Sequence, residues 1–234
     1  MTNFQIDIIS DVVCPWCYVG KTRLEKAISH YRSLSPSNAT DTFTTTWSPF
    51  YLNPDAPRTG IDKQEYYRSK FGAQRTAMIF QRLSAIGAES GINFKYGGKT
   101  GNTRDAHRVV QLAKEMEAKG DKGRQTRVVE ELFRSYFEEE GDITDRGVLT
   151  QAAVKAGLEE GEVKEWLETD GGGKLVDREV EEAQMRMIHG VPHFTIQGLY
   201  EVGGAEDPAV FVEIFEKIKG KVRSNGAVKG GETC

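Results

Sequence analysis

Nine residues near the N-terminus set the fold: Ser10-Asp11-Val12-Val13-Cys14-Pro15-Trp16-Cys17-Tyr18. They follow an apolar run, residues 4–9, whose alternating side chains are typical of a strand. Pro15 suits the first turn of a helix, where its missing N–H costs nothing. A C-x-x-C pair at a strand-to-helix junction is a redox signature, because unpaired N–H groups and the helix dipole favour a thiolate at the first sulfur. The stretch therefore predicts thiol chemistry at Cys14 and Cys17.

The 234 residues carry a formal net charge of -4 and are 38% hydrophobic, which is ordinary for a soluble globular protein. No basic field is indicated, so neither nucleic acid nor a membrane is expected as a partner. Residues 1–7 lack the features of a secretory signal, and no apolar run approaches about 18 residues, so we expect a cytoplasmic protein. In that compartment a C-x-x-C pair is more often catalytic or metal-binding than a structural disulfide.

A zinc site and a pair of inert thiols are the alternatives to a redox pair. A C-x-x-C zinc site needs two further ligands at a defined spacing. The remaining cysteine is Cys234, and the histidines, which show no ligand pattern, are His30, His107, His189 and His193. We therefore expect no bound metal, and a redox-active pair is favoured over inert thiols.

Hydrophobic periodicity predicts an α/β chain in the order βαβ, a helical block, then αββα. The helical block is recognised by long helix-forming runs with few β-branched clusters. The last residues contain Gly and Lys without any period, which predicts a flexible tail. From the N- to the C-terminus the predicted segments are 1–60 (βαβ), 61–173 (helical), 174–218 (αββα) and 219–234 (tail).

Local signals predict where several elements begin and end. Residues 34–41, rich in Ser, Pro, Asn and Thr, are expected to form a loop. One helix is predicted over 65–83, closed by the glycines that follow it. A later helix is expected to be capped by Asn102, and a strand is predicted over 190–196 with a proline at its entrance.

Four motifs stand in order along the chain: Ser10-Asp11-Val12-Val13-Cys14-Pro15-Trp16-Cys17-Tyr18-Val19-Gly20, Leu52-Asn53-Pro54, Asn102-Thr103-Arg104-Asp105-Ala106-His107-Arg108 and Gly190-Val191-Pro192. With the element order, they resemble the DsbA family, and more closely its FrnE-like branch. That branch is related to the glutathione-dependent 2-hydroxychromene-2-carboxylate isomerases and kappa-class glutathione transferases. The implied fold is α/β and thioredoxin-like with a large α-helical insertion. Segments 1–60 and 174–218 would be the two halves of its thioredoxin-like domain.

The resemblance implies roles for the cysteines. Cys14 would be the nucleophile and Cys17 the resolving thiol. Isomerase and transferase relatives carry serine where Cys14 stands, so two sulfurs favour disulfide chemistry. Trp16 stands where DsbA itself has histidine and offers the thiolate no protonated partner, so we expect a couple less oxidising than the about -120 mV of DsbA. Cys234 is interpreted as an exposed tail thiol that could fold back and resolve Cys14.

The resemblance also implies a substrate-binding loop beside the redox motif. Pro192 would be a cis-proline facing the disulfide, with Pro15 and Trp16 supporting the motif. A cis bond would leave the Val191 backbone free to pair with a peptide or glutathione. The ordinary alternative is a trans proline that opens an edge strand.

Four further residues are candidates for contacts with a substrate or glutathione. Asn53 matches a glutathione-contacting position in the kappa-class relatives, although Pro54 beside it equally suits a turn. Arg104 and His107 share a helix face and could meet an anion, or form a solvated or structural pair. His193, next to the proline, could line the rim of the site or be satisfied within its strand.

The sequence supports one main function and two alternatives. The main one is a DsbA/FrnE-like thiol–disulfide oxidoreductase that acts on protein disulfides or thiols, without a tightly bound cofactor. The first alternative is a glutathione-dependent isomerase or transferase that acts on an aromatic or polyketide-like small molecule, with glutathione as co-substrate. The second is a non-catalytic, partner-binding thioredoxin-like module. We expect a monomer or a homodimer.

Overall fold

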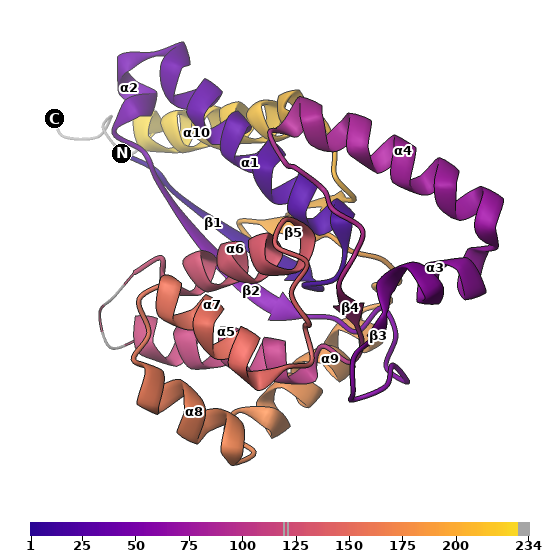
Figure 1. Cartoon of the computed structure of the whole chain (residues 1–234). Helices are drawn as coiled ribbons and strands as arrows, with labels where there is room; N and C mark the ends of the chain where they lie inside the picture. The colour runs from indigo at the N-terminus through magenta and orange to yellow at the C-terminus, as the bar shows by residue number, and fades with distance from the viewer. Residues whose placement is uncertain (119, 121, 229–234) are drawn as a thin grey trace, which may run out of the picture.

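The computed structural model describes residues 1–118, 120 and 122–228, with side chains described up to residue 222. The described part contains a four-stranded sheet in the order β2-β1-β5-β6. Its strands are β1 (Asn3–Ser10), β2 (Thr42–Pro49), β5 (His193–Ile196) and β6 (Tyr200–Gly203). β1 and β2 are parallel, whereas β5 is antiparallel to β1 and to β6. The sheet therefore joins the two ends of the chain (Figure 1).

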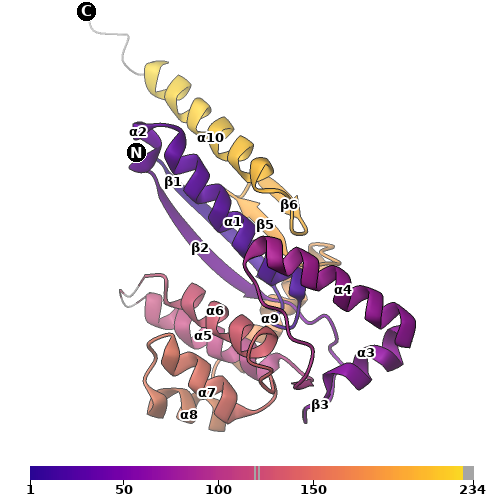
Figure 2. The same cartoon turned by 45° about the horizontal axis from the view of Figure 1, so that its top comes forward.

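The centre of the core is β1, whose alternating residues point to opposite sides. Residues 4, 6 and 8 are buried, while residues 3, 5 and 7 are exposed. Helices α1 (Pro15–Leu34) and α10 (Pro208–Val228) lie side by side along the sheet (Figure 2). Phe4, Tyr31, Phe43 and Phe215 join them to the strands, with ring centroids 4.8 to 5.9 Å apart. This aromatic cluster holds α1, and with it the C-x-x-C motif, against β1.

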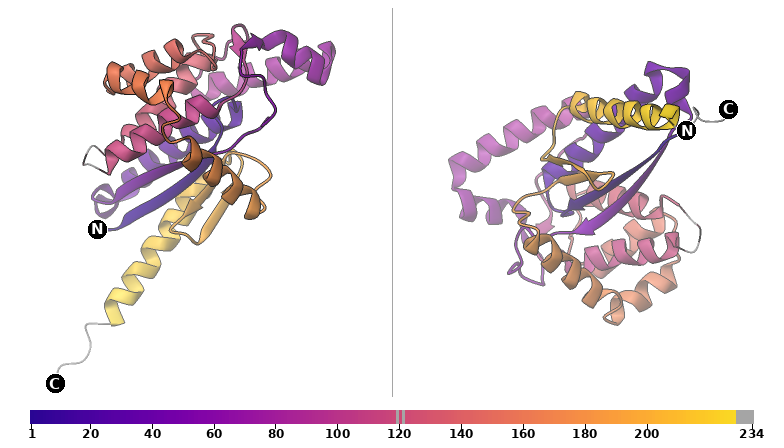
Figure 3. Two further views of the ribbon diagram at one scale, coloured as in Figure 1. Left: turned by 90° about the horizontal axis from the view of Figure 1, so that it is seen from below. Right: turned by 180° about the vertical axis from the view of Figure 1, so that it is seen from behind.

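Part of the helical insertion, a bundle of helices, covers the other side of the sheet from α10 (Figure 3). Its bundle consists of α5 (Arg104–Glu117), α6 (Arg124–Phe137), α7 (Arg146–Lys155) and α8 (Glu160–Glu168), followed by α9 (Gly173–Met185). One side chain of α6 attaches the bundle to the edge strand β2. Gln125 accepts from the Trp47 N–H and donates to the Trp47 carbonyl, both at 2.9 Å. The insertion is thereby fixed to the sheet by backbone-like hydrogen bonds.

The prediction of a single helix over 65–83 is wrong, because the helix is interrupted at Gly72. The two helices are α3 (Lys63–Phe71) and α4 (Ala73–Ser90), and Gly72 between them has φ +79°, a conformation that favours glycine. α4 continues past Gly87, the first of the two glycines expected to end the helix, and ends at Ser90 with Gly91 as its C-cap. The two-residue strand β3 (Ile61–Asp62) precedes these two helices, and the two-residue strand β4 (Lys99–Thr100) follows them. β3 and β4 form an antiparallel pair.

Two segments predicted as irregular are helical. The loop over 34–41 contains the short helix α2 (Pro36–Ala39), where the buried Asn38 side chain donates to the Tyr31 carbonyl at 3.1 Å. The tail predicted from residue 219 is instead helical to Val228 within α10. Lys219 explains the extension, because its buried ammonium bonds the Ser37 carbonyl at 2.9 Å and the Asp41 carboxylate. Tertiary contacts here outweigh the helix-breaking tendency of glycine.

Two further boundaries differ slightly from prediction. Thr103 is the N-cap of α5, although the Asn102 side chain does accept the Arg104 N–H at 3.0 Å. The strand predicted from residue 190 begins at His193. No helix among the described residues is long and apolar enough to cross a bilayer. The cytoplasmic location stays a prediction.

Candidate active site

The C-x-x-C motif lies where β1 ends and α1 begins. β1 stops at Ser10, and a turn follows in which the Cys14 N–H donates to the Asp11 carbonyl at 3.0 Å. Cys14 is the N-cap of α1, with extended backbone angles, and Pro15 occupies the first helical position. The Cys14 side chain makes no capping bond, so its sulfur is not tied to the helix backbone. Cys14 thus lies just beyond the C-terminal ends of the parallel strands β1 and β2.

Cys14 and Cys17 are both free thiols and both buried, at 4% and 1% exposure. Burial raises the pKa of the Cys17 thiol well above its usual value, and its hydrogen bond with Cys14 and the charge of that sulfur raise it further. The Ser10 hydroxyl and the Asp11 backbone oppose this shift. The Cys17 thiol therefore keeps its proton at neutral pH and shares it with the Cys14 sulfur.

The Val191–Pro192 loop lies directly across from the motif. The Val191–Pro192 peptide bond is cis, the isomer that the resemblance implied. The Cys14 Sγ donates to the Val191 carbonyl at 3.5 Å, although the two residues are 177 positions apart. Gly20 permits this approach, because a Cβ there would lie 2.9 Å from Pro192 Cγ. The Cys14 sulfur and the loop backbone are thus in contact.

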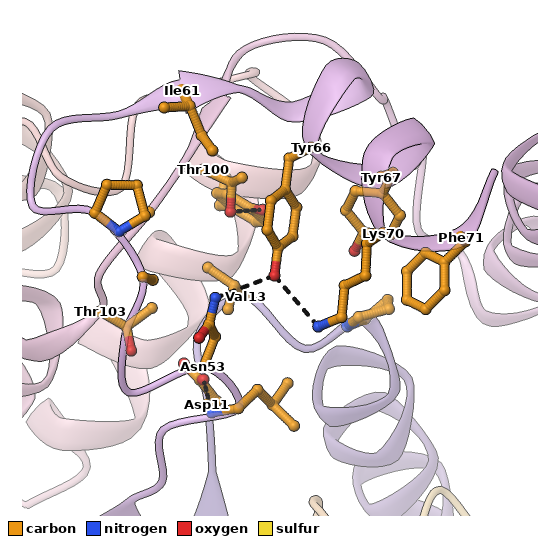
Figure 4. A pocket seen from close by; sticks show the side chains of 16 residues that line it. Asp11, Val13, Asn53, Ile61, Tyr66, Tyr67, Lys70, Phe71, Thr100 and Thr103 are labelled. Carbon is orange, nitrogen blue, oxygen red and sulfur yellow. Dashed lines mark hydrogen bonds between the residues drawn. The ribbon is translucent and has the colours of Figure 1, made fainter. Parts of the chain in front are cut away.

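A cavity of about 240 Å³ lies beside the motif, and Val13 and Pro15, the neighbours of Cys14, line it. The opposite wall comes from α3, which contributes the side chains of Tyr66, Tyr67, Lys70 and Phe71 (Figure 4). Tyr136, Asp11 and Asn53 also line the cavity. A cavity of this kind beside a thiol can hold an aromatic or apolar group of a ligand.

Comparison with known proteins decides the family. The family model described as the DSBA-like thioredoxin domain matches residues 5–216. The chain belongs to the DSBA-like thioredoxin domain family. This DSBA-like protein is 31% identical over 219 residues to the uncharacterized protein YwbO of Bacillus subtilis strain 168, covering 91% of this chain and 94% of YwbO.

Solved structures share the fold of the DSBA-like protein. The probable DsbA oxidoreductase SCO1869 from Streptomyces coelicolor has a TM-score of 0.79 at 28% identity, covering 93% of this chain and 90% of that chain. The cytosolic disulfide reductase DsbM from Pseudomonas aeruginosa, in a structure with GSH, has a TM-score of 0.58 at 13% identity, covering 91% and 98%. The likeness to DsbM is one of fold alone. The predicted α/β, thioredoxin-like fold with a helical insertion is confirmed.

Among the predicted contact residues of this DSBA-like protein, Asn53 is the one that lines the cavity beside Cys14. Its Nδ2 donates to the Tyr66 hydroxyl at 3.3 Å. The Lys70 ammonium donates to the same hydroxyl, also at 3.3 Å. Sequence patterns gave no sign of Tyr66 or Lys70, since an aromatic pair in a helical block is more simply explained as core.

Arg104 and His107 lie outside the cavity and have partners of their own. The Arg104 guanidinium bonds the Asp177 and Asp170 carboxylates at 2.9 and 2.8 Å. These bonds lower the pKa of both carboxyl groups. The buried His107 Nε2 lies 3.2 Å from the Phe50 carbonyl and 3.4 Å from Asp11 Oδ1. Arg104 thus joins α5 to α9 and the segment before it, and His107 joins α5 to the residue that follows β2. Both have the structural role that the sequence left open.

His193 lies on β5, and Trp16 lies within the motif, in the first turn of α1. The His193 Nε2 has no hydrogen-bond partner among the described residues, the nearest charge being Glu201 at 4.0 Å. Trp16 receives the guanidinium of Arg82, from α4, 5.7 Å from its ring centre. Cys234 lies outside the described residues. Within the described part of the chain, no group of three His, Cys, Asp or Glu could hold a metal ion.

Lys63 contacts Tyr136, one of the residues that line the cavity. Its Nζ is buried, donates to the Tyr136 carbonyl at 2.8 Å and lies 3.7 Å from the centre of the Tyr136 ring. The Tyr136 hydroxyl in turn donates to Thr100 at 2.9 Å. Burial lowers the pKa of Lys63 to about 8. Lys63 therefore holds Tyr136 in place, and the burial of its ammonium group costs desolvation free energy.

We predict that Lys63→Met changes how stability depends on pH. Folding lowers the pKa of Lys63 from 10.5 to about 8, so the folded protein releases this proton first, and wild-type stability rises with pH relative to the variant across that interval. The relative gain should be roughly 2–3 kcal/mol. Urea unfolding of both proteins from about pH 7 to about pH 11 measures it, with exposed Lys70→Met as control. A stability difference that stays constant with pH would contradict this assignment.

Proposed function

We propose that this protein is a thiol–disulfide oxidoreductase in which Cys14 attacks and Cys17 resolves. The observation that carries the proposal is the contact between the Cys14 sulfur, at the N-terminus of α1, and the Val191 carbonyl, at 3.5 Å. A helix N-terminus favours the thiolate, and a backbone segment beside it can hold an extended substrate. Membership of the DSBA-like thioredoxin domain family supports this chemistry.

The reaction consists of two exchanges. The Cys14 thiolate attacks one sulfur of the substrate disulfide, a Cys14–substrate bond forms, and the electron pair of the broken S–S bond leaves on the second substrate sulfur. Cys17 then loses its proton and attacks the Cys14 sulfur, which releases the first substrate sulfur as a thiolate. The substrate is reduced and the Cys14–Cys17 pair is oxidised. Two molecules of glutathione, as co-substrate, would return the pair to its dithiol form, and the reverse sequence oxidises a dithiol.

The residues around the pair have separate tasks in this proposal. The backbone of Val191, held next to Pro192, would pair with the substrate chain beside its sulfur. The aromatic cavity would take the group attached to that sulfur, with Asn53 at its wall. Glutathione as co-substrate and a cytoplasmic location are supported by the fold shared with DsbM, a cytosolic disulfide reductase whose structure was solved with GSH.

The redox couple itself provides the test. A Cys234→Ser protein, which retains only the Cys14–Cys17 pair, is equilibrated in glutathione buffers of increasing oxidation, quenched, alkylated and weighed by mass spectrometry. We expect an intramolecular disulfide with a potential more negative than the about -120 mV of DsbA, because Trp16 supplies no proton to the thiolate. Cys17→Ala in the same background is the control and should form only a glutathione adduct. Two thiols that stay reduced in the most oxidising buffer would contradict the proposal.

A glutathione-dependent isomerase or transferase is the second candidate, and the cavity is the observation that favours it. Its aromatic wall and the Asn53–Tyr66–Lys70 hydrogen bonds suit a small aromatic molecule as well as a peptide side chain. In that case Cys17→Ala should leave turnover of the small molecule intact, and omission of glutathione should stop it.

A further inference from the structure

The wall of the cavity that faces the redox motif carries two tyrosine hydroxyls from α3. In Figure 4 the hydroxyl ends of Tyr66 and Tyr67 both point from the helix into the cavity, toward the side on which Val13 lies. The Tyr66 oxygen already accepts hydrogen bonds from Asn53 and Lys70. The Tyr67 hydroxyl makes no hydrogen bond to any residue that the structure describes. A polar group of this kind on the wall of a cavity is available to a ligand.

Tyr67 lies within electrostatic range of the nucleophile. The cavity that it lines is also lined by Val13 and Pro15, the residues on either side of Cys14. Burial raises the pKa of Tyr67, and the negative charge of Cys14 raises it further. The phenol therefore keeps its proton at neutral pH and acts as a hydrogen-bond donor.

The Tyr67 ring is also held firmly in place. It packs against Phe80 of α4 and Phe71 of α3, with centroids 5.4 and 5.8 Å apart, and against Tyr66 at 5.9 Å. Three neighbouring rings fix the direction of the hydroxyl. A donor fixed before the substrate arrives costs little reorganisation when charge develops next to it.

We propose that Tyr67 is a further catalytic residue, whose hydroxyl donates a hydrogen bond to the sulfur that leaves the substrate disulfide when Cys14 attacks. This inference rests on the proposed function. In the step, the Cys14–sulfur bond forms, the substrate S–S bond breaks, and its electron pair moves to the departing sulfur. The Tyr67 proton stays on its oxygen and is shared in the hydrogen bond. The departing thiolate takes a proton from water after release.

The leaving group supplies a selective test. A thiol of low pKa leaves readily without help, whereas an alkyl thiol leaves slowly and gains from a hydrogen bond. Two uncharged disulfides separate these cases: bis(2-hydroxyethyl) disulfide releases an alkyl thiolate, and 4,4′-dipyridyl disulfide releases a stabilised aromatic one. The rate at which each oxidises the reduced protein is followed by acid quench and alkylation.

With Tyr67→Phe we expect the rate to fall about 10- to 100-fold for bis(2-hydroxyethyl) disulfide, as for loss of a hydrogen bond to a charged group. For 4,4′-dipyridyl disulfide we expect a change of less than about twofold, because that leaving group needs no donor. Tyr96→Phe is the matched control. Its hydroxyl bonds Ser84 and the Phe80 carbonyl and does not line the cavity, so neither rate should change.

Three results would overturn the inference: equal losses with both disulfides, no loss with either, or a selective loss in Tyr66→Phe with none in Tyr67→Phe. If the wild-type protein reacts with neither disulfide, the proposed function fails and the inference falls with it. If both react and Tyr67→Phe matches wild type, the inference alone fails.

A second measurement serves if Tyr67→Phe does not fold. Wild-type rates with a series of uncharged disulfides are compared with the rates of a free thiol in solution. A donor at the leaving sulfur should make the protein's rates less dependent on the pKa of the leaving thiol. An equal dependence in protein and solution would overturn the inference.

Discussion

Replacing Cys17 with alanine should turn the protein into a trap that retains its substrate as a disulfide on Cys14. Cys14 can still attack, but no neighbouring thiol is left in α1 to attack the bond that forms. Well-oriented intramolecular steps reach effective concentrations of about 10⁵–10⁸ M, which no thiol in solution can match. We therefore expect insulin reduction with glutathione to fall at least about 10³-fold, while an adduct accumulates.

Non-reducing electrophoresis and intact mass measure the adduct of Cys17→Ala directly. Cys14→Ser is the matched control, because it replaces the other sulfur of the pair and should give neither adduct nor turnover. The experiment also separates the two candidate functions. Cys17→Ala that reduces insulin at the wild-type rate would remove the oxidoreductase, whereas full turnover of a small aromatic substrate would favour the isomerase or transferase.

Arg108→Met should destabilise the fold by about 3–5 kcal/mol, the usual cost of breaking a buried ion pair. Arg108 is 1% exposed and bonds Asp105 at 2.7 Å and the Gly171 carbonyl at 2.8 Å. It also bonds the carbonyls of Thr169, at 2.6 Å, and Trp166. Methionine leaves a carboxylate and three carbonyl groups without this donor. The melting temperature should drop by roughly 6–20 °C.

Thermal and urea unfolding of Arg108→Met measure this loss. Arg178→Met is the control, because Arg178 is an exposed helix arginine paired only loosely with Glu182, at 3.6 Å, and its removal should cost less than about 0.5 kcal/mol. A loss below about 1 kcal/mol in Arg108→Met would mean that water replaces the guanidinium. The rate of Cys14 alkylation at low temperature should be unchanged.

Local signals predict the part of the site that is local. The alternation before Ser10 and the proline after Cys14 are enough to place a sulfur at a strand-to-helix junction. The contact of Cys14 with Val191 spans 177 positions, and no periodicity could pair them. The resemblance to the DsbA family predicted that these two segments meet, because a resemblance is judged over the whole chain and not over short stretches of sequence.

The wall of the cavity could not be predicted for a physical reason. Tyr66 and Tyr67 stand on α3, which turns away from α4 at Gly72, and a single glycine in a helical run is equally compatible with an unbroken helix. Arg104 and His107 illustrate the opposite case. Their residue types suggested anion binding, but the tertiary fold placed two aspartates and a backbone carbonyl against them.

The two hydrogen bonds between the Gln125 side chain and the Trp47 backbone affect whether β2 can pair with a strand of another molecule. β2 is an edge strand of the sheet and is rich in threonine and aromatic residues. The unpaired N–H and C=O groups of such a strand can pair with a strand of another molecule. The glutamine amide occupies the N–H and C=O that Trp47 would offer to such a strand. The helical insertion therefore blocks strand addition at this position of the β2 edge. A shortened chain without it would present that edge open.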